Sequence, residues 1–255
     1  MPGTIIKIKT GEDVLSAAIH RIEWLFDTFS SVCLSFSGGK DSTVLFHLVA
    51  DVARRKMRRF SVLFIDWEAQ YQCTIEHILK MREMYRDVTD TFYWVALPLT
   101  TVNGVSQFQP EWICWEPGVT WVRQPPEYAI TDMAYFPFYR YAMTFEEFVP
   151  VFSSWYVGNK CGVAVLTGAR VDESLNRFMG LVLQRKLRYA DDKLWITASL
   201  EGFYYTMYPL YDLKARDILI YNVFPAPAGI KRIALIVASI GHGSAGARSI
   251  ATMAT

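Results

Sequence analysis

A short turn of small and charged residues, SGGKDS at positions 37–42, lies between an apolar run and an amphipathic one. Residues 32–36 have the composition of a buried strand, and residues 42–52 place their apolar side chains on one face of a helix. The unpaired N–H groups and the dipole of a helix N-terminus attract anions. The turn therefore predicts a phosphate-binding loop.

The side chains of the turn suit a bound polyphosphate. Gly38 and Gly39 permit a positive φ and a close approach of the backbone to a ligand. Lys40 adds a mobile positive charge, and two hydroxyl groups come from Ser37 and Ser42. The spacing is neither that of GxxxxGK[ST] nor that of GxGxxG, so the turn is a different kind of phosphate loop.

An acidic residue, Asp41, lies in the same turn, beside the expected phosphates. Two interpretations fit a carboxylate at this position. It either shares a Mg²⁺ ion with the nucleotide or caps the helix that follows.

The elements around the turn alternate between strand and helix, which predicts parallel strands with right-handed crossovers in an α/β domain. Helical spacing extends over residues 13–29, before the turn. The further expected elements are strands at 60–65, 91–97, 162–167 and 206–210, and helices at 72–85, 143–158 and 213–221.

Two segments depart from this alternation. Residues 98–140 are rich in proline and aromatic residues, which predicts a long irregular insertion that is ordered by packing. Its rings either pack or stack a base, and packing is the favoured interpretation. Residues 225–255 are rich in Ala, Gly and Ser, so we expect a domain at 1–224 followed by an atypical tail that is truncated, frameshifted or disordered.

The composition limits the classes of function. With 52% hydrophobic residues and a formal net charge of +1, the chain is globular and has no bulk attraction for nucleic acid or membranes. The basic run at 54–59 is best interpreted as a solvated helix C-terminus, with nucleic-acid contact as the alternative. We expect a cytoplasmic protein without membrane association, because there is no apolar run of about 18 residues, no signal-peptide core and no CxxC pair among the four cysteines.

SGGKDS after a strand resembles the pyrophosphate loop (PP-loop) of the N-type ATP pyrophosphatases and of the phosphoadenosine phosphosulfate (PAPS) reductase family. TGARVDESLNR at 167–177 is similar to the second motif of that family, TGxRxxES followed by Arg. KTGEDVLSAAIHRIEWLFD, FQPEWICWEP and MYPLYDLKARDI resemble the bacterial and phage subgroup of IbrA and YbdN relatives. The resemblance, over residues 10–220, implies a Rossmann-like adenine nucleotide alpha hydrolase fold, with a mostly parallel twisted sheet and helices on both faces.

The resemblance implies binding of ATP or a related adenine nucleotide, with Mg²⁺ on Asp41. It implies that Gly168 admits the nucleotide, that Arg170 and Arg177 bind phosphate or sulfate oxygens, and that Asp66 meets the adenosine. Glu173 would orient an arginine or a metal, and the residues expected to be catalytic are Lys40, Asp41 and Arg170. The full nucleotide-binding set predicted is Ser35, Ser37, Gly38, Gly39, Lys40, Asp41, Ser42, Asp66, Gly168, Arg170, Glu173, Ser174 and Arg177.

Three functions remain open from the sequence. PAPS reduction by the family's route is not expected, because no cysteine follows Cys161 to serve as the C-terminal nucleophile. The favoured alternative is an ATP pyrophosphatase that adenylylates an unknown acceptor. The others are a nucleotide-binding regulator that acts with a ParB-like protein or with DNA, and sulfur transfer to nucleic acid through Cys73 or Cys114. Family analogy adds a homodimer.

Overall fold

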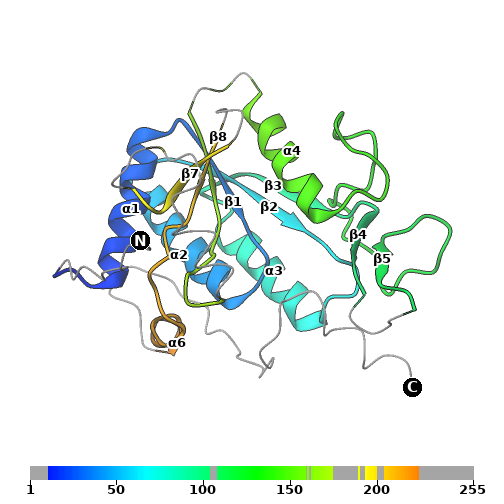
Figure 1. The fold of residues 1–255 in the computed structure, drawn as a ribbon, viewed down its shortest axis with the longest axis horizontal. Coiled ribbons are helices and arrows are strands. Elements are labelled where there is room, and N and C mark those ends of the chain that lie inside the picture. Colours follow the sequence, from blue (N-terminus) through cyan, green and yellow to red (C-terminus); the bar gives the residue numbers. More distant parts are fainter. Residues whose placement is uncertain are drawn as a thin grey trace, which may run out of the picture.

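The computed structural model describes residues 11–103, 108–158, 160, 162–174, 189, 193–199 and 204–223. Their centre is a six-stranded sheet with the order β3-β2-β1-β6-β8-β7 (Figure 1). Its strands are β1 Ser31–Ser35, β2 Phe60–Ile65, β3 Thr89–Val95, β6 Val163–Leu166, β7 Ile196–Ala198 and β8 Tyr204–Met207. Every neighbouring pair is parallel except β7 and β8. The mostly parallel α/β fold expected from the sequence is confirmed.

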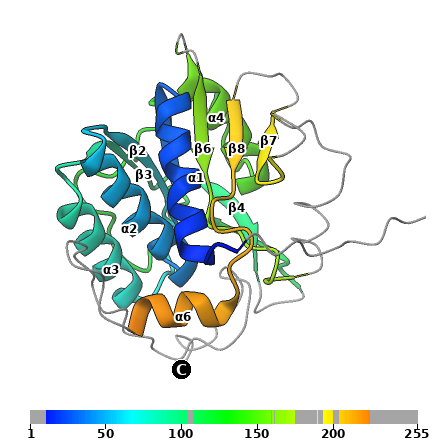
Figure 2. The ribbon, with the colours of Figure 1, turned by 90° about the vertical axis from the view of Figure 1, so that its left-hand side faces the viewer.

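Helices cover both faces of this sheet (Figure 2). One face packs against α1 Val14–Thr28, α2 Lys40–Arg55, α3 Gln72–Met84 and α6 Ala215–Val223. The other face packs against α4 Phe145–Val157. The alternation along β1 explains this division, because Val32 and Leu34 join the first cluster and Cys33 joins the second. None of the described helices has the length and apolar character needed to cross a membrane.

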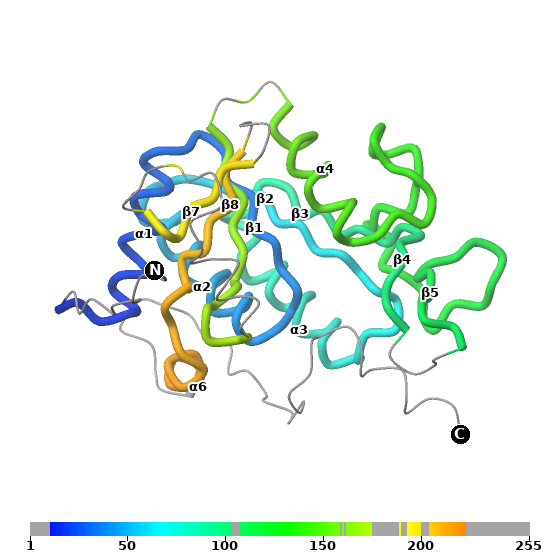
Figure 3. The backbone as a smooth tube through the Cα atoms, in the orientation of Figure 1, coloured from blue at the N-terminus to red at the C-terminus, as the bar shows by residue number. Residues whose placement is uncertain are grey.

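The segment at 98–140 is more regular than the sequence predicted. It contains an antiparallel pair of strands, β4 Leu99–Val102 and β5 Glu111–Cys114. Ile130 extends the edge of β3, where its N–H donates to the Trp94 carbonyl at 2.7 Å and its carbonyl accepts from the Ala96 N–H at 3.0 Å. β4 and β5 form a separate two-stranded sheet, which lies beyond the carboxyl ends of β2 and β3 (Figure 3). The rings of the insertion pack against α4, as the favoured interpretation holds.

The basic side chains of residues 54–59 form ion pairs and hydrogen bonds within the protein. Arg54 pairs with Asp87, Arg55 with Glu23 and Lys56 with Asp27. Arg58 donates to three carbonyl groups at and just after the end of α1, including that of Phe26 at 2.7 Å. These contacts close the C-terminal ends of α1 and α2, which supports the structural interpretation of the run.

Candidate functional site

The loop at 37–42 joins β1 to α2. Its shape is set by a close approach to α3 and by hydrogen bonds among its own serines. Gly38 has a φ of 75°, and a Cβ there would lie 2.9 Å from the Ile78 Cδ1 atom of α3. The Ser42 hydroxyl donates to the Gly39 carbonyl at 3.1 Å and lies 3.0 Å from the Ser37 hydroxyl. Gly39 is the N-cap of α2 and supplies no side-chain hydrogen bond to it. The first N–H groups of α2 therefore keep the anion-binding character predicted for the turn.

The loop lies where the strand order of the sheet reverses. β1 is flanked by β2 on one side and by β6 on the other, and ligands of open α/β sheets bind at this point. Gly168, just after β6, packs directly on the start of α2. A Cβ at Gly168 would lie 3.0 Å from the Ser42 nitrogen and 3.2 Å from the Asp41 carbonyl carbon. The structure thus brings the two predicted nucleotide motifs into contact.

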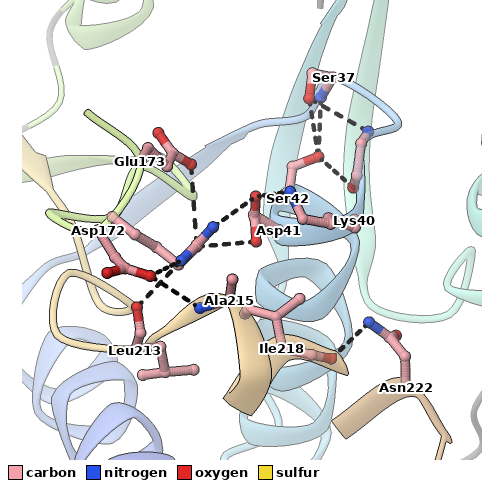
Figure 4. Close-up of polar contacts among 12 residues, drawn as sticks. Ser37, Lys40, Asp41, Ser42, Asp172, Glu173, Leu213, Ala215, Ile218 and Asn222 are labelled. Atoms are coloured by element: carbon pink, nitrogen blue, oxygen red, sulfur yellow. Dashed lines mark hydrogen bonds and ion pairs between the residues drawn. The ribbon is translucent and has the colours of Figure 1, made fainter. Parts of the chain in front are cut away.

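An ion pair joins the two motifs as well. Arg170 is only 3% exposed, and its Nε donates to Asp41 Oδ1 at 2.9 Å (Figure 4). Its Nη1 donates to the Leu213 carbonyl at 3.3 Å and lies 3.7 Å from Asp172 Oδ2. Glu173 approaches the same guanidinium at 4.0 Å. The arginine predicted to bind phosphate is therefore held by carboxylates of the protein itself.

Lys40 is the accessible positive charge of the loop. Its side chain is 56% exposed, and its Nζ lies 3.0 Å from Asp41 Oδ2. Such an ammonium group can move from Asp41 to a bound phosphate without a change of fold.

A Mg²⁺ ion does not fit Asp41 in this arrangement. Both carboxylate oxygens of Asp41 already face nitrogen atoms of Arg170 and Lys40. No group of three or more His, Cys, Asp or Glu residues in the described ranges could hold a metal ion. A small hard cation needs free oxygen ligands, so Mg²⁺ could bind here only after this ion pair opened.

Three further residues of the predicted nucleotide-binding set make no contact described above. Ser35 ends β1 and is half-buried, and Ser174 is an exposed residue of the segment that carries Arg170. Arg177 lies outside the described residues.

Asp66, predicted to meet the adenosine, is fully buried at the end of β2. Its carboxylate accepts from Trp94 Nε1 at 2.7 Å, from the Glu68 N–H at 3.0 Å and from the Arg123 guanidinium. Burial raises the pKa of Asp66, while Arg123 and the hydrogen bond from Trp94 oppose that shift. These hydrogen bonds give Asp66 a structural role. The predicted contact of Asp66 with adenosine stays a prediction.

Glu68 is a buried carboxylate that the sequence analysis missed. It has a φ of 60°, and its oxygens accept from the Trp115 N–H at 2.6 Å and from the Val122 N–H at 2.8 Å. Its carbonyl accepts from Arg123 Nε at 2.9 Å. The one signal in the sequence is the pair of acids around Trp67 at the end of a buried strand. We call Asp66, Glu68 and Arg123 the insertion anchor, because they fix the insertion to the end of β2.

The cysteines differ sharply in accessibility. Cys33 and Cys114 are buried, and burial raises the pKa of each to about 12. Cys73 is exposed in the first turn of α3, and Cys161 lies outside the described residues. Neither buried thiol forms the thiolate that sulfur transfer needs at neutral pH, so this route rests on Cys73 among the described cysteines.

We expect thiol labelling to separate these groups. In a Cys161→Ser background at pH 7.5, a disulfide reagent should modify one thiol of the folded protein quickly and two more only after unfolding. Adding Cys73→Ser should abolish the fast reaction, whereas Cys114→Ser should leave it intact. Fast labelling that survives Cys73→Ser would contradict the burial of Cys33 and Cys114.

Two comparisons with known proteins concern the sequence. The family description "Phosphoadenosine phosphosulfate reductase domain" matches residues 31–96, which include β1, the loop and α2. The uncharacterized protein YbdN of Escherichia coli (strain K12) is 52% identical over 215 residues. That match covers 84% of this chain and 53% of YbdN, so the chain spans about half the length of the curated relative it matches.

Similar solved structures are more distant. Yeast FAD synthetase in complex with FAD has a TM-score of 0.44 at 15% identity, covering 85% of this chain and 61% of that one. The U34-tRNA thiolase NcsA of Methanococcus maripaludis, with its [4Fe-4S] cluster, has a TM-score of 0.41 at 13% identity, covering 81% and 62%. Residues 31–96 thus match the phosphoadenosine phosphosulfate reductase domain, and the chain is similar to YbdN over 84% of its own length.

Proposed function

We propose that the chain binds ATP or a related adenine nucleotide through the loop at 37–42 and transfers AMP to an acceptor. The observation that carries this proposal is the packing of Gly168 on the uncapped start of α2, where the strand order reverses. This arrangement leaves backbone N–H groups and the exposed Lys40 for the polyphosphate.

In the proposed reaction, a nucleophilic oxygen of the acceptor forms a bond to the α-phosphorus of ATP. The bond from that phosphorus to the oxygen that bridges to the β-phosphate breaks, and pyrophosphate leaves with the bonding electrons. The N–H groups of the loop and the ammonium of Lys40 stabilise the negative charge that develops on the leaving group. The proton of the acceptor passes to solvent.

Calorimetry with ATP, AMP and PAPS, each with and without Mg²⁺, tests the binding step. We expect Lys40→Ala to weaken ATP binding about 10- to 100-fold, since it removes one charge-assisted contact of roughly 1.5–3 kcal/mol. The matched control is Lys56→Ala at the other end of α2, where the lysine pairs with Asp27. Equal affinities of both variants and the parent for ATP would reject the proposed role of the loop.

A nucleotide-binding regulator is the second candidate, and the closed Arg170–Asp41 pair favours it. An arginine that is already neutralised by a carboxylate has less charge to offer a transition state than a free one. This candidate acts with a protein partner or with DNA. It predicts tight ATP binding without pyrophosphate release, so a pyrophosphate assay on the ATP-binding protein separates it from the adenylylating enzyme.

A further inference from the structure

We propose that Arg170 is a positioning residue whose ion pair with Asp41 joins the two nucleotide-binding loops, and that neither side chain contacts the nucleotide or a metal. The inference deepens the proposed function and rests on it, because it states which residues shape the phosphate loop and which ones bind phosphate. Backbone N–H groups and Lys40 are then the phosphate-binding groups, and Asp41 is an internal anchor.

The first argument is the use of the guanidinium's donors. Nε and Nη2 of Arg170 face the two oxygens of Asp41 at 2.9 and 3.4 Å, and Nη1 donates to the Leu213 carbonyl at 3.3 Å. All three nitrogen atoms thus have partners within the protein. The second N–H groups of Nη1 and Nη2 remain, but the side chain is only 3% exposed and presents little surface to a phosphate in this arrangement.

The second argument is that the Arg170–Asp41 pair and its neighbour Asp172 connect three segments of the chain: the start of α2, the segment after β6 and the start of α6 (Figure 4). Asp41 belongs to the start of α2, and Arg170 to the segment after β6. Asp172, which lies 3.7 Å from the guanidinium, accepts from the Ala215 N–H at the start of α6 at 3.1 Å. The pair therefore fixes the phosphate loop against β6 and α6 together.

The third argument is burial. The side chain of Arg170 is 3% exposed and that of Asp41 is 14% exposed. Removing one member of such a pair leaves the other with more distant or more exposed partners in a site that water barely reaches, which is unfavourable. Because Gly168 packs against the backbone of Asp41 and Ser42, a displaced Asp41 also moves the N–H groups that would hold the phosphates.

A double-mutant cycle measured by calorimetry tests the inference. The variants are Asp41→Asn, Arg170→Gln and the double variant, each titrated with ATP in the presence and absence of Mg²⁺. We expect each single change to weaken ATP binding roughly tenfold, equally with and without Mg²⁺, and the double change to weaken it no more than the worse single change. Hydrogen exchange of the amides at 40–43 should quicken in all three variants.

Two results would overturn the inference. Losses that add in the double variant would mean that the two side chains contact the ligand independently. An Asp41→Asn variant that keeps its Mg²⁺-free affinity but loses the effect of Mg²⁺ would make Asp41 a metal ligand. Arg170→Lys replaces Arg170→Gln in the cycle if the latter does not fold.

The failure of the proposed function is a distinct result. If the parent protein binds no adenine nucleotide, that function falls, and urea unfolding of the same four proteins then decides the inference. Coupled losses of stability support the positioning pair, and additive losses reject it.

Discussion

Asp66→Asn is expected to lower the free energy of unfolding by about 3–5 kcal/mol, the usual cost of breaking a buried ion pair from one side. Asp66 is fully buried, and its carboxylate accepts hydrogen bonds from Trp94, Glu68 and Arg123. An asparagine would turn an N–H₂ group toward one of these donors and leave the Arg123 charge without its carboxylate. Fluorescence from the tryptophans around the insertion anchor, followed through urea unfolding, measures the loss.

The matched control is Asp90→Asn on β3. Asp90 is 69% exposed and lies 3.9 Å from Arg59, so this surface pair contributes only about 0–1 kcal/mol. Equal stability of the Asp66→Asn variant and this control would show that the insertion anchor does not hold the insertion on β2.

Gly168→Ala is expected to weaken ATP binding roughly tenfold or more and to cost about 1–3 kcal/mol of stability. The new methyl group would approach the Ser42 nitrogen and the Ser42 Cα at 3.0 and 3.1 Å. These are backbone atoms of the first turn of α2, so the N–H groups that hold the phosphates must shift. Calorimetry with ATP and thermal unfolding measure the two effects.

Gly39→Ala is the control for this change. Its Cβ would meet only the flexible Ser37 hydroxyl, at 3.3 Å, and its φ of −75° suits any residue. We expect the Gly39→Ala variant to have a thermal unfolding temperature close to that of the parent protein. A Gly168→Ala variant with unchanged stability and unchanged ATP affinity would mean that the contact between the two motifs does not shape the loop.

The central fold was predictable because its signals are local. The apolar run before SGGKDS and the helical spacing after it specify β1 and α2, and the same alternation predicts the next strands. The contact between the two motifs is a finding of the structure, in which β1 and β6 are neighbours at the point where the strand order reverses.

The parts that sequence reasoning missed depend on contacts between distant segments. β7 has three residues and is placed by pairing with β8, and β4 and β5 pair within a segment that the sequence predicted to be irregular. Glu68 and Arg123 are 55 positions apart, and nothing in the spacing marks them as partners. The family resemblance implies a phosphate contact for Arg170, whereas the burial of Arg170 beside Asp41 is visible only in three dimensions.

The most direct test of the central claim is a crystal structure of the protein with α,β-methylene ATP, whose bridging carbon blocks cleavage. The account predicts phosphate oxygens within hydrogen-bonding distance of backbone N–H groups at 38–42, with Lys40 turned from Asp41 to the phosphates. Two results would contradict the account. The analogue could bind elsewhere, or the loop at saturating analogue could stay empty, with Lys40 still paired with Asp41.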